Sequence, residues 1–351
     1  KKLGADGLCA INIGGGIAVE YSQHSSKMDR NYQLEEFAND VVFLLQSIAN
    51  AKGVQEPDIY TESGRFVAAN HAVLVAPVLE LYSNDLASRN LRLKDQNPPL
   101  IDELNCLYET MTQSNSLEFL HDTIDHMESL LTLFDLGYID LTDRSNTEVL
   151  VHLIIRKFIA LSNGSHLKEF KNLEDSMQEK YLVNFSLFQS IPDYWGLSQN
   201  FPVMPLTKLD EAPTRAASIW DITCDSDGEM CFNKKNPLFL HDVDLEKEDY
   251  FLAFFKVGAY QEVLGMQHNL FTHPTEVTIE FDANGQYQIS NLLHAQSLLD
   301  ILDDMDYDIK DIEMRLRHRI GDSNSILEDE KKEILGELYL YMSENAYLKT
   351  I

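Results

Sequence analysis

The chain has 351 residues and a formal net charge of −29, and 44% of its residues are hydrophobic. It is longer than one ordinary domain and apolar enough for packed cores, which excludes a chain that is disordered throughout. The acidic balance argues against nucleic acid or a membrane as a partner, and no apolar run reaches the roughly 18 residues of a membrane-spanning helix.

The first predicted elements alternate in the order of a parallel α/β unit. An apolar run at 8–13 predicts a buried strand, and glycines at 14–16 stop it. Helical spacing follows over 32–51 with Gly53 as a stop, and a second strand is predicted at 58–62. This order is typical of a β/α barrel. Because the chain begins inside such a unit, we expect upstream sequence to be missing.

Beyond this unit the sequence pattern changes three times. Strand patterns over 71–96 and 181–290 predict a β domain, either a sandwich or a barrel. Residues 97–180 interrupt that domain with scarce glycine and helical apolar spacing, which predicts an inserted bundle of about three helices. Acidic amphipathic helices are predicted over 291–351. With residues 1–70 as the end of the barrel, the predicted fold class is α/β plus β.

The four cysteines, at positions 9, 106, 224 and 231, lack the spacing of a metal site and suit a reducing cytoplasm. Cys224 stands directly before Asp225, and Asp227 precedes the turn at Gly228. A thiol and a fixed carboxylate beside a bend suit a proton donor next to an amine-binding site. The simpler alternative is a buried cysteine beside an Asp-Gly turn.

Three further motifs follow predicted strands. The first is a run of glycines whose backbone N–H groups can surround a phosphate, or which form only a tight turn: Gly14, Gly15 and Gly16. In Glu62-Ser63-Gly64-Arg65, the carboxylate can hold a ring nitrogen protonated and Arg65 suits a phosphate, unless the two form a structural ion pair. Tyr260 ends an aromatic strand and either points its hydroxyl at a phosphate or belongs to the core.

Taken together and in this order, the four motifs resemble the pyridoxal-phosphate decarboxylases of the alanine-racemase fold, and most closely the biosynthetic arginine decarboxylases. Longer runs at 186–190, 221–228 and 257–261 carry the resemblance. So does the helical insertion before the second sheet, which the smaller ornithine and diaminopimelate enzymes lack. The resemblance covers nearly the whole chain and implies the C-terminal portion of such an enzyme, with the end of a TIM-type barrel that binds pyridoxal phosphate.

The resemblance also implies how the cofactor is held. The glycine run, Arg65 and Tyr260 would bind its phosphate, and Glu62 would pair with its ring nitrogen. That pairing makes chemical sense, because decarboxylation leaves a carbanion that a protonated ring stabilises. The Schiff-base lysine of the family lies on an early barrel strand. Neither Lys1 nor Lys2 fits that position, so we expect the covalent anchor upstream of this chain.

Substrate contacts follow from the same resemblance. Cys224 would protonate the carbon that loses carbon dioxide, and Asp225 would hold the distal cationic group, with Asp227 as a further candidate. Ornithine decarboxylases carry an aspartate where Phe185 stands here, which argues against ornithine. Phe185 is a candidate for stacking on a planar guanidinium. In the family, Cys224 and Asp225 would reach into the site of a partner subunit, which implies at least a homodimer.

The predicted function is decarboxylation of L-arginine to agmatine for polyamine biosynthesis in the cytoplasm, by a longer parent enzyme. A Mg²⁺ requirement is implied by the family, with no ligand set legible in the sequence. Two alternatives stay open. The substrate is another basic or diamino acid, or the chain is a non-catalytic homologue that regulates a decarboxylase by subunit binding. Identifying the upstream lysine would separate the last alternative from the others.

Overall fold

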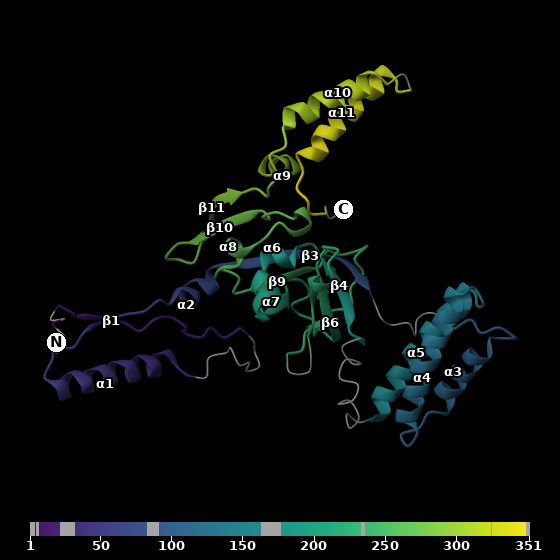
Figure 1. The fold of residues 1–351 in the computed structure, drawn as a ribbon, viewed down its shortest axis with the longest axis horizontal. Coiled ribbons are helices and arrows are strands. Elements are labelled where there is room, and N and C mark those ends of the chain that lie inside the picture. The colour runs from purple at the N-terminus through teal and green to yellow at the C-terminus, as the bar shows by residue number, and fades with distance from the viewer. Residues whose placement is uncertain are drawn as a thin grey trace.

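A computed structural model describes Gly4 and residues 7–21, 32–82, 91–162, 177–232, 236–323 and 325–348. These residues form an N-terminal α/β unit, a central sheet, a helical bundle and a C-terminal helical region, which Figure 1 shows extending away from one another. Among the described helices, none combines the length and the apolar character needed to cross a membrane.

The N-terminal unit contains the predicted strand, helix and strand. β1 (Ala10–Asn12) and β2 (Asp58–Tyr60) pair in parallel, and α1 (Leu34–Lys52) connects them. The helix ends at Gly53, whose φ of 60° is a left-handed conformation that glycine adopts without a steric penalty. The helix predicted over 32–51 is therefore confirmed. Because the strands are parallel, both end at the same edge of the pair.

The central sheet has seven strands in a mixed arrangement. Its order is β5-β9-β3-β4-β6-β7, with β8 paired to β6 beside this path. The strands are β3 (Val73–Tyr82), β4 (Glu179–Val183), β5 (Val203–Pro205), β6 (Arg215–Trp220), β7 (Glu229–Met230), β8 (Phe239–Leu240) and β9 (Phe251–Phe255). β4 and β6 are parallel, and the other pairs are antiparallel. Their inward side chains form one buried core that includes Tyr181, Val183, Ile219, Leu252 and Phe254.

Short helices join the sheet to the N-terminal unit and cover one end of it. α2 (Gly64–Ala68) and the 3₁₀ turn η1 (Ala69–His71) lead from β2 into β3. α6 (Leu187–Ser190) and α7 (Pro192–Leu197) follow β4, and α8 (Gln261–Leu264) follows β9. Figure 1 shows α6, α7 and α8 gathered beside the sheet near α2. The motifs that lie far apart in the sequence therefore meet in this region.

The helical bundle consists of α3 (Pro99–Thr110), α4 (Ser116–Asp135) and α5 (Leu141–Ser162). These helices pack on one another around a second apolar core, separate from that of the sheet, which includes Ile101, Leu104, Leu120, Leu150, Ile154 and Phe158. The predicted helical spacing between residues 97 and 180 is thus confirmed for these three helices.

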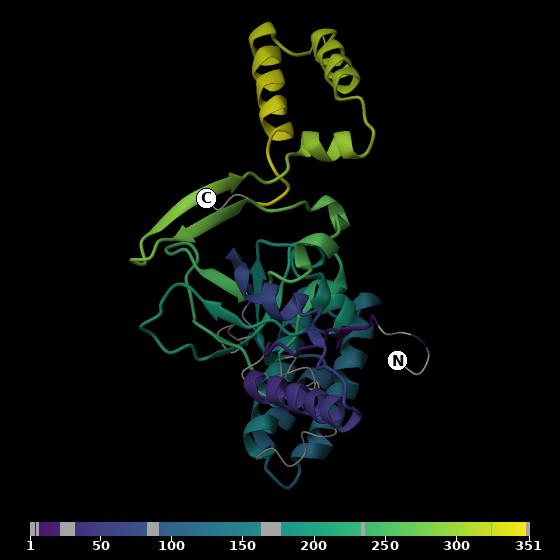
Figure 2. The same ribbon diagram turned by 90° about the vertical axis from the view of Figure 1, so that its left-hand side faces the viewer.

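A hairpin and three helices follow the sheet. Among the described strands, β10 (Glu276–Phe281) and β11 (Tyr287–Leu293) pair only with each other, so β10 does not join the central sheet as the sequence suggested. The cross-strand pairs Val277–Leu292, Ile279–Ile289 and Phe281–Tyr287 form an apolar face that stays exposed within this chain. α9 (Leu298–Asp304), α10 (Ile309–Gly321) and α11 (Glu328–Met342) complete the fold, and Figure 2 shows α10 and α11 projecting beyond the hairpin.

Candidate functional site

The glycine run lies where β1 and β2 end, in contact with the segment that follows β2. The Glu62 amide donates to the Gly14 carbonyl at 2.8 Å, and the Gly14 amide donates to the Asn12 side chain at 2.8 Å. A Cβ on Gly15 would lie 2.6 Å from the Glu62 carbonyl oxygen, and Gly14 and Gly16 have φ of 80° and 83°. The close approach and the left-handed backbone explain why these positions need glycine.

Glu62 is oriented by a neighbour on β1. The Asn12 amide donates to Glu62 Oε1 at 2.7 Å, while the carboxylate itself stays exposed. The alternative of a Glu62–Arg65 ion pair is not what the structure contains, because Arg65 pairs elsewhere. Glu62 is thus a fixed, accessible anion at the edge where two parallel strands end.

Arg65 is held by three aromatic and acidic side chains. Its guanidinium donates to Asp193 at 2.8 Å and to the Tyr21 hydroxyl at 3.1 Å, and it lies over the Tyr260 ring at 4.9 Å. Asp193 is only 3% exposed. Burial opposes the arginine charge, but the hydrogen bonds to Asp193 and Tyr21 outweigh it and raise the pKa of Arg65 above its ordinary value. Arg65 is therefore a permanent cation with a fixed direction.

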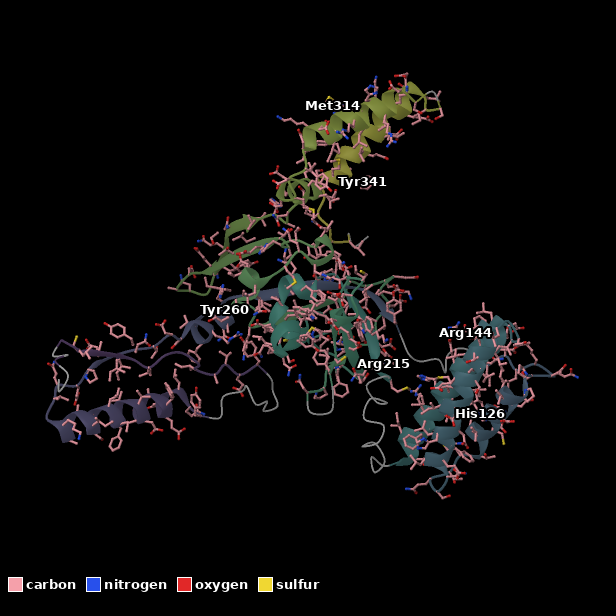
Figure 3. All side chains as sticks on the ribbon, in the orientation of Figure 1. His126, Arg144, Arg215, Tyr260, Met314 and Tyr341 are labelled. Atoms are coloured by element: carbon pink, nitrogen blue, oxygen red, sulfur yellow. The ribbon has the colours of Figure 1, made fainter. Side chains whose placement is uncertain are left out.

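Tyr260 reaches the same place from β9. Its backbone has a φ of 70°, and its hydroxyl lies 3.3 Å from where a Cβ on Gly64 would stand. The next residue, Gln261, exchanges two hydrogen bonds with Asp193, so one buried carboxylate ties both Arg65 and the Tyr260 segment. Figure 3 shows Tyr260 at the junction of the N-terminal unit and the sheet. We call Gly14–Gly16, Glu62, Arg65 and Tyr260 the glycine-loop cluster.

The cysteine motif is anchored by a buried aspartate at its start. Asp221 accepts the Leu187 amide at 2.8 Å and both the amide and the hydroxyl of Thr223. Burial raises the pKa of the Asp221 carboxyl, and these hydrogen bonds work in the opposite direction. A Cβ on Gly228 would collide with the Asp221 carboxylate, so the bend that closes the motif requires glycine.

The residues between these anchors, 224–227, form what we call the thiol loop. Cys224 is exposed, and its backbone N–H and its thiol both donate to Asn269 Oδ1, at 3.2 and 3.5 Å. Asp225 Oδ2 lies 3.3 Å from His268 Nε2. Asp227 accepts the indole N–H of Trp195 at 3.1 Å. Because the thiol is exposed, the alternative of a buried cysteine beside a turn is wrong.

Phe185 is a correction to the predicted site. Only 2% of its surface is exposed, and its ring packs on Phe254 with centroids 4.9 Å apart. The side chain points into the core of the sheet, so no face is open to a guanidinium. Trp195, by contrast, is 48% exposed.

Several residues of the site were missed by sequence reasoning: Asn12, Asp193, Gln261, His268 and Asn269. Asn12 offered a signal, because it is the last polar residue before the glycines. Asp193 offered none, because its partner Arg65 lies 128 residues away. Gln261 directly follows Tyr260 in the run 257–261, whereas nothing local marks His268 and Asn269, and the partner of Asn269 lies 45 residues away.

Among the described residues, one group of three side chains brings together atoms that could hold a metal ion. Glu262, His273 and Glu276 each place one such atom within 4.8 Å of the others. The two glutamates are exposed. Mg²⁺ prefers oxygen ligands in octahedral geometry, so a group containing an imidazole does not match it.

Two family models match the chain. Residues 1–69 match the pyridoxal binding domain of pyridoxal-dependent decarboxylases, and residues 94–173 match the arginine decarboxylase helical bundle domain. α3, α4 and α5 lie within the second range.

Curated relatives and one solved structure agree with these matches. The biosynthetic arginine decarboxylase of Citrifermentans bemidjiense is 36% identical over 91% of this chain and 52% of its own length, and that of Deinococcus radiodurans is 36% identical over 96% and 54%. The crystal structure of the biosynthetic arginine decarboxylase from Campylobacter jejuni is 61% identical, with a TM-score of 0.87, over all of this chain and 58% of that one. The chain spans about half the length of the curated relatives it matches.

Proposed function

The chain belongs to the family of the biosynthetic arginine decarboxylases, and from this premise we propose that the whole protein converts L-arginine to agmatine and carbon dioxide. The observation that carries the proposal is the glycine-loop cluster, in which the glycine run contacts the Glu62 segment and one buried carboxylate, Asp193, joins Arg65 to the Tyr260 segment. In the same proposal, β1, α1 and β2 belong to a larger barrel. The proposed domains are the barrel end at 1–70, the β domain at 71–96 and 181–290, the inserted bundle at 97–180 and the helical region at 291–351.

The residues of the glycine-loop cluster fit pyridoxal phosphate as cofactor. A phosphate suits the fixed cation of Arg65, the Tyr260 hydroxyl and a glycine run in which a Cβ on Gly15 would collide with backbone. The carboxylate of Glu62, oriented by Asn12, would hold the proton of a ring nitrogen. When bound, the cofactor supplies an electron sink for the bond that breaks.

The thiol loop supplies the proton and the recognition of the substrate. When carbon dioxide leaves, the electron pair of the broken bond stays with the α carbon, which takes the thiol proton of Cys224. The thiolate then regains a proton from water. Asp225 would pair with the guanidinium, and Asp227 adds negative charge beside it.

We propose that the thiol loop acts in the site of a second subunit. Within the part of the chain that the structure describes, no hydrogen bond or ion pair joins the thiol loop directly to the glycine-loop cluster. The active unit is then at least a homodimer. Four free, exposed cysteines support a reducing, cytoplasmic location. A Mg²⁺ requirement belongs to the same proposal, without an assigned ligand set.

The test is a substrate panel on the full-length protein. With pyridoxal phosphate present, carbon dioxide and amine products are followed for L-arginine beside ornithine, lysine and diaminopimelate. Agmatine from arginine alone is the expected result. A product from another amino acid would move the assignment to that substrate, and no product from any of them would favour the non-catalytic homologue.

A further inference from the structure

The segment after α8 returns to the thiol loop through a tightly constrained turn. A Cβ on Gly265 would collide with the Gln189 carbonyl, and the Met266 amide donates to the Phe188 carbonyl at 3.2 Å. These contacts press the segment onto α6 just before the 3₁₀ turn η5 (His268–Leu270). Backbone contacts just before η5 therefore help to set its position.

Two successive residues of η5 have a left-handed backbone. Asn269 has a φ of 54° and Leu270 a φ of 64°. Asparagine tolerates this region, whereas leucine rarely adopts it, and such strain persists only where the surrounding structure imposes it. The left-handed turn points the Asn269 amide at Cys224.

Asn269 fixes Cys224 in two ways at once. Its Oδ1 accepts the Cys224 backbone N–H at 3.2 Å and the thiol at 3.5 Å, so one oxygen sets both the chain position and the direction of the sulfur. Because an amide oxygen only accepts hydrogen bonds, the sulfur is the donor in this contact. A proton donor has to act from a fixed direction, and this contact supplies one.

His268, the residue before Asn269, contacts Asp225 of the thiol loop. The His268 ring stacks on Phe188 with centroids 4.4 Å apart, and its Nε2 lies 3.3 Å from Asp225 Oδ2 at ion-pair distance, though not in hydrogen-bond geometry. Adjacent residues of η5 thus face adjacent residues of the thiol loop.

We propose that η5 is the positioning device of the thiol loop, with Asn269 as the positioning residue for Cys224. This inference rests on the proposed function for its catalytic meaning. The geometric part, that Asn269 restrains the thiol, stands independently of the reaction.

The test uses three variants of the full-length protein with pyridoxal phosphate. Asn269→Gly keeps a residue suited to positive φ and removes the acceptor, whereas Asn269→Asp keeps both the backbone preference and an acceptor oxygen. Asp306→Gly is the matched control, because Asp306 is another exposed residue with a positive φ, of 60°, between α9 and α10.

The first readout is independent of activity. Iodoacetamide labelling of Cys224 is measured by peptide mass spectrometry against the exposed Cys106 in the same sample. We expect severalfold faster labelling in Asn269→Gly, because the released thiol rotates more freely, and no acceleration in the other two variants. Equal rates in wild type and Asn269→Gly would overturn the inference.

The second readout is agmatine formed per carbon dioxide released from arginine. Asn269→Gly should lower kcat for agmatine about tenfold and change KM little. Carbon dioxide should then form in excess of agmatine. Asn269→Asp should restore most of the kcat. Unchanged kcat and stoichiometry in Asn269→Gly would contradict the positioning role. If wild type forms no agmatine, the proposed function fails, and the labelling result decides the restraint alone.

Discussion

At the scale of single residues, Gly15 shows how a missing side chain lets two strand ends meet. Its Cα faces the carbonyl of Glu62, and the pair β1–β2 has space for hydrogen there and for nothing larger. The Glu62 carboxylate that follows is then placed by Asn12. A change at Gly15 therefore affects Glu62 through the backbone.

We expect Gly15→Ala to weaken cofactor binding and to cost about 1–3 kcal/mol of unfolding free energy, because the added Cβ must displace backbone. Pyridoxal phosphate titration and thermal unfolding of the full-length protein measure the two effects. Gly7→Ala is the control, since a Cβ on Gly7 meets nothing within 4 Å. Equal behaviour of the two variants would show that the loop is not constrained as described.

Glu62→Gln should lower kcat by about a hundredfold or more and change KM little, because an amide does not hold a proton on the ring nitrogen. Steady-state kinetics with arginine provide the measurement. Glu56→Gln, an exposed change in the same unit, should leave kcat near the wild-type value. A Glu62→Gln enzyme with normal turnover would remove Glu62 from the mechanism.

The motifs were visible in the sequence, but their supports were not. Glycine runs and an acid before Gly-Arg are local patterns that chemistry alone can interpret. Asp193 reaches Arg65 across 128 residues, and Asn269 reaches Cys224 across 45. Such partners are set by chain packing, so one sequence contains no local mark of them.

At the scale of elements, Tyr181 on β4, Tyr250 directly before β9 and Tyr194 on α7 are buried or partly buried, and their hydroxyls stay hydrogen-bonded. Tyr181 donates to the His241 carbonyl at 2.8 Å, and the Tyr194 hydroxyl accepts the Cys231 amide at 2.9 Å. Burial raises the pKa of Tyr181 and of Tyr250 above the ordinary value, and raises the pKa of Tyr194 to about 12.

These shifts predict a loss of stability at alkaline pH. Tyrosines of the unfolded chain ionise near pH 10 while the buried ones stay neutral, so their contribution is complete below about pH 10 and is lost as pH rises toward 12. Denaturant unfolding from pH 8 to 12 measures this decline in stability. Tyr194→Phe should lower stability at pH 8 but flatten the alkaline decline.

Tyr287→Phe is the control for this series, because Tyr287 is 71% exposed on the hairpin. This variant should keep the wild-type dependence of stability on pH. A Tyr194→Phe protein that loses stability as steeply as wild type between pH 10 and 12 would contradict the assigned cause.

The short helix α7 links the two groups of candidate site residues. Asp193, in its first turn, holds Arg65, and Trp195, two residues later, holds Asp227. A six-residue element thereby connects the glycine-loop cluster and the thiol loop of one subunit.

At the scale of the whole molecule, the bundle and the sheet each have an apolar core of their own. The core of the bundle contains Leu150 on α5, and the core of the sheet contains Leu252 on β9, the strand that leads to Tyr260. Both leucines are fully buried. Damage to one core should therefore stay within its own part of the chain.

Leu150→Ala and Leu252→Ala should each cost about 2–5 kcal/mol of stability, but in different places. Hydrogen exchange should rise in peptides of α3–α5 for the first variant and in peptides of the sheet for the second. Only Leu252→Ala should also weaken pyridoxal phosphate binding. Loss of protection throughout both regions in either variant would show that the two cores are coupled.

The sequence by itself determined the helix between β1 and β2, the helical insertion, several strands and the order of the four motifs, because apolar periodicity and glycine conformation are properties of a few neighbouring residues. Tertiary structure alone decided that Phe185 is buried, that Cys224 is exposed, that Arg65 pairs with Asp193, and that β10 pairs outside the sheet. Each of these depends on which distant segments pack together, and burial and pairing are settled only when those segments meet.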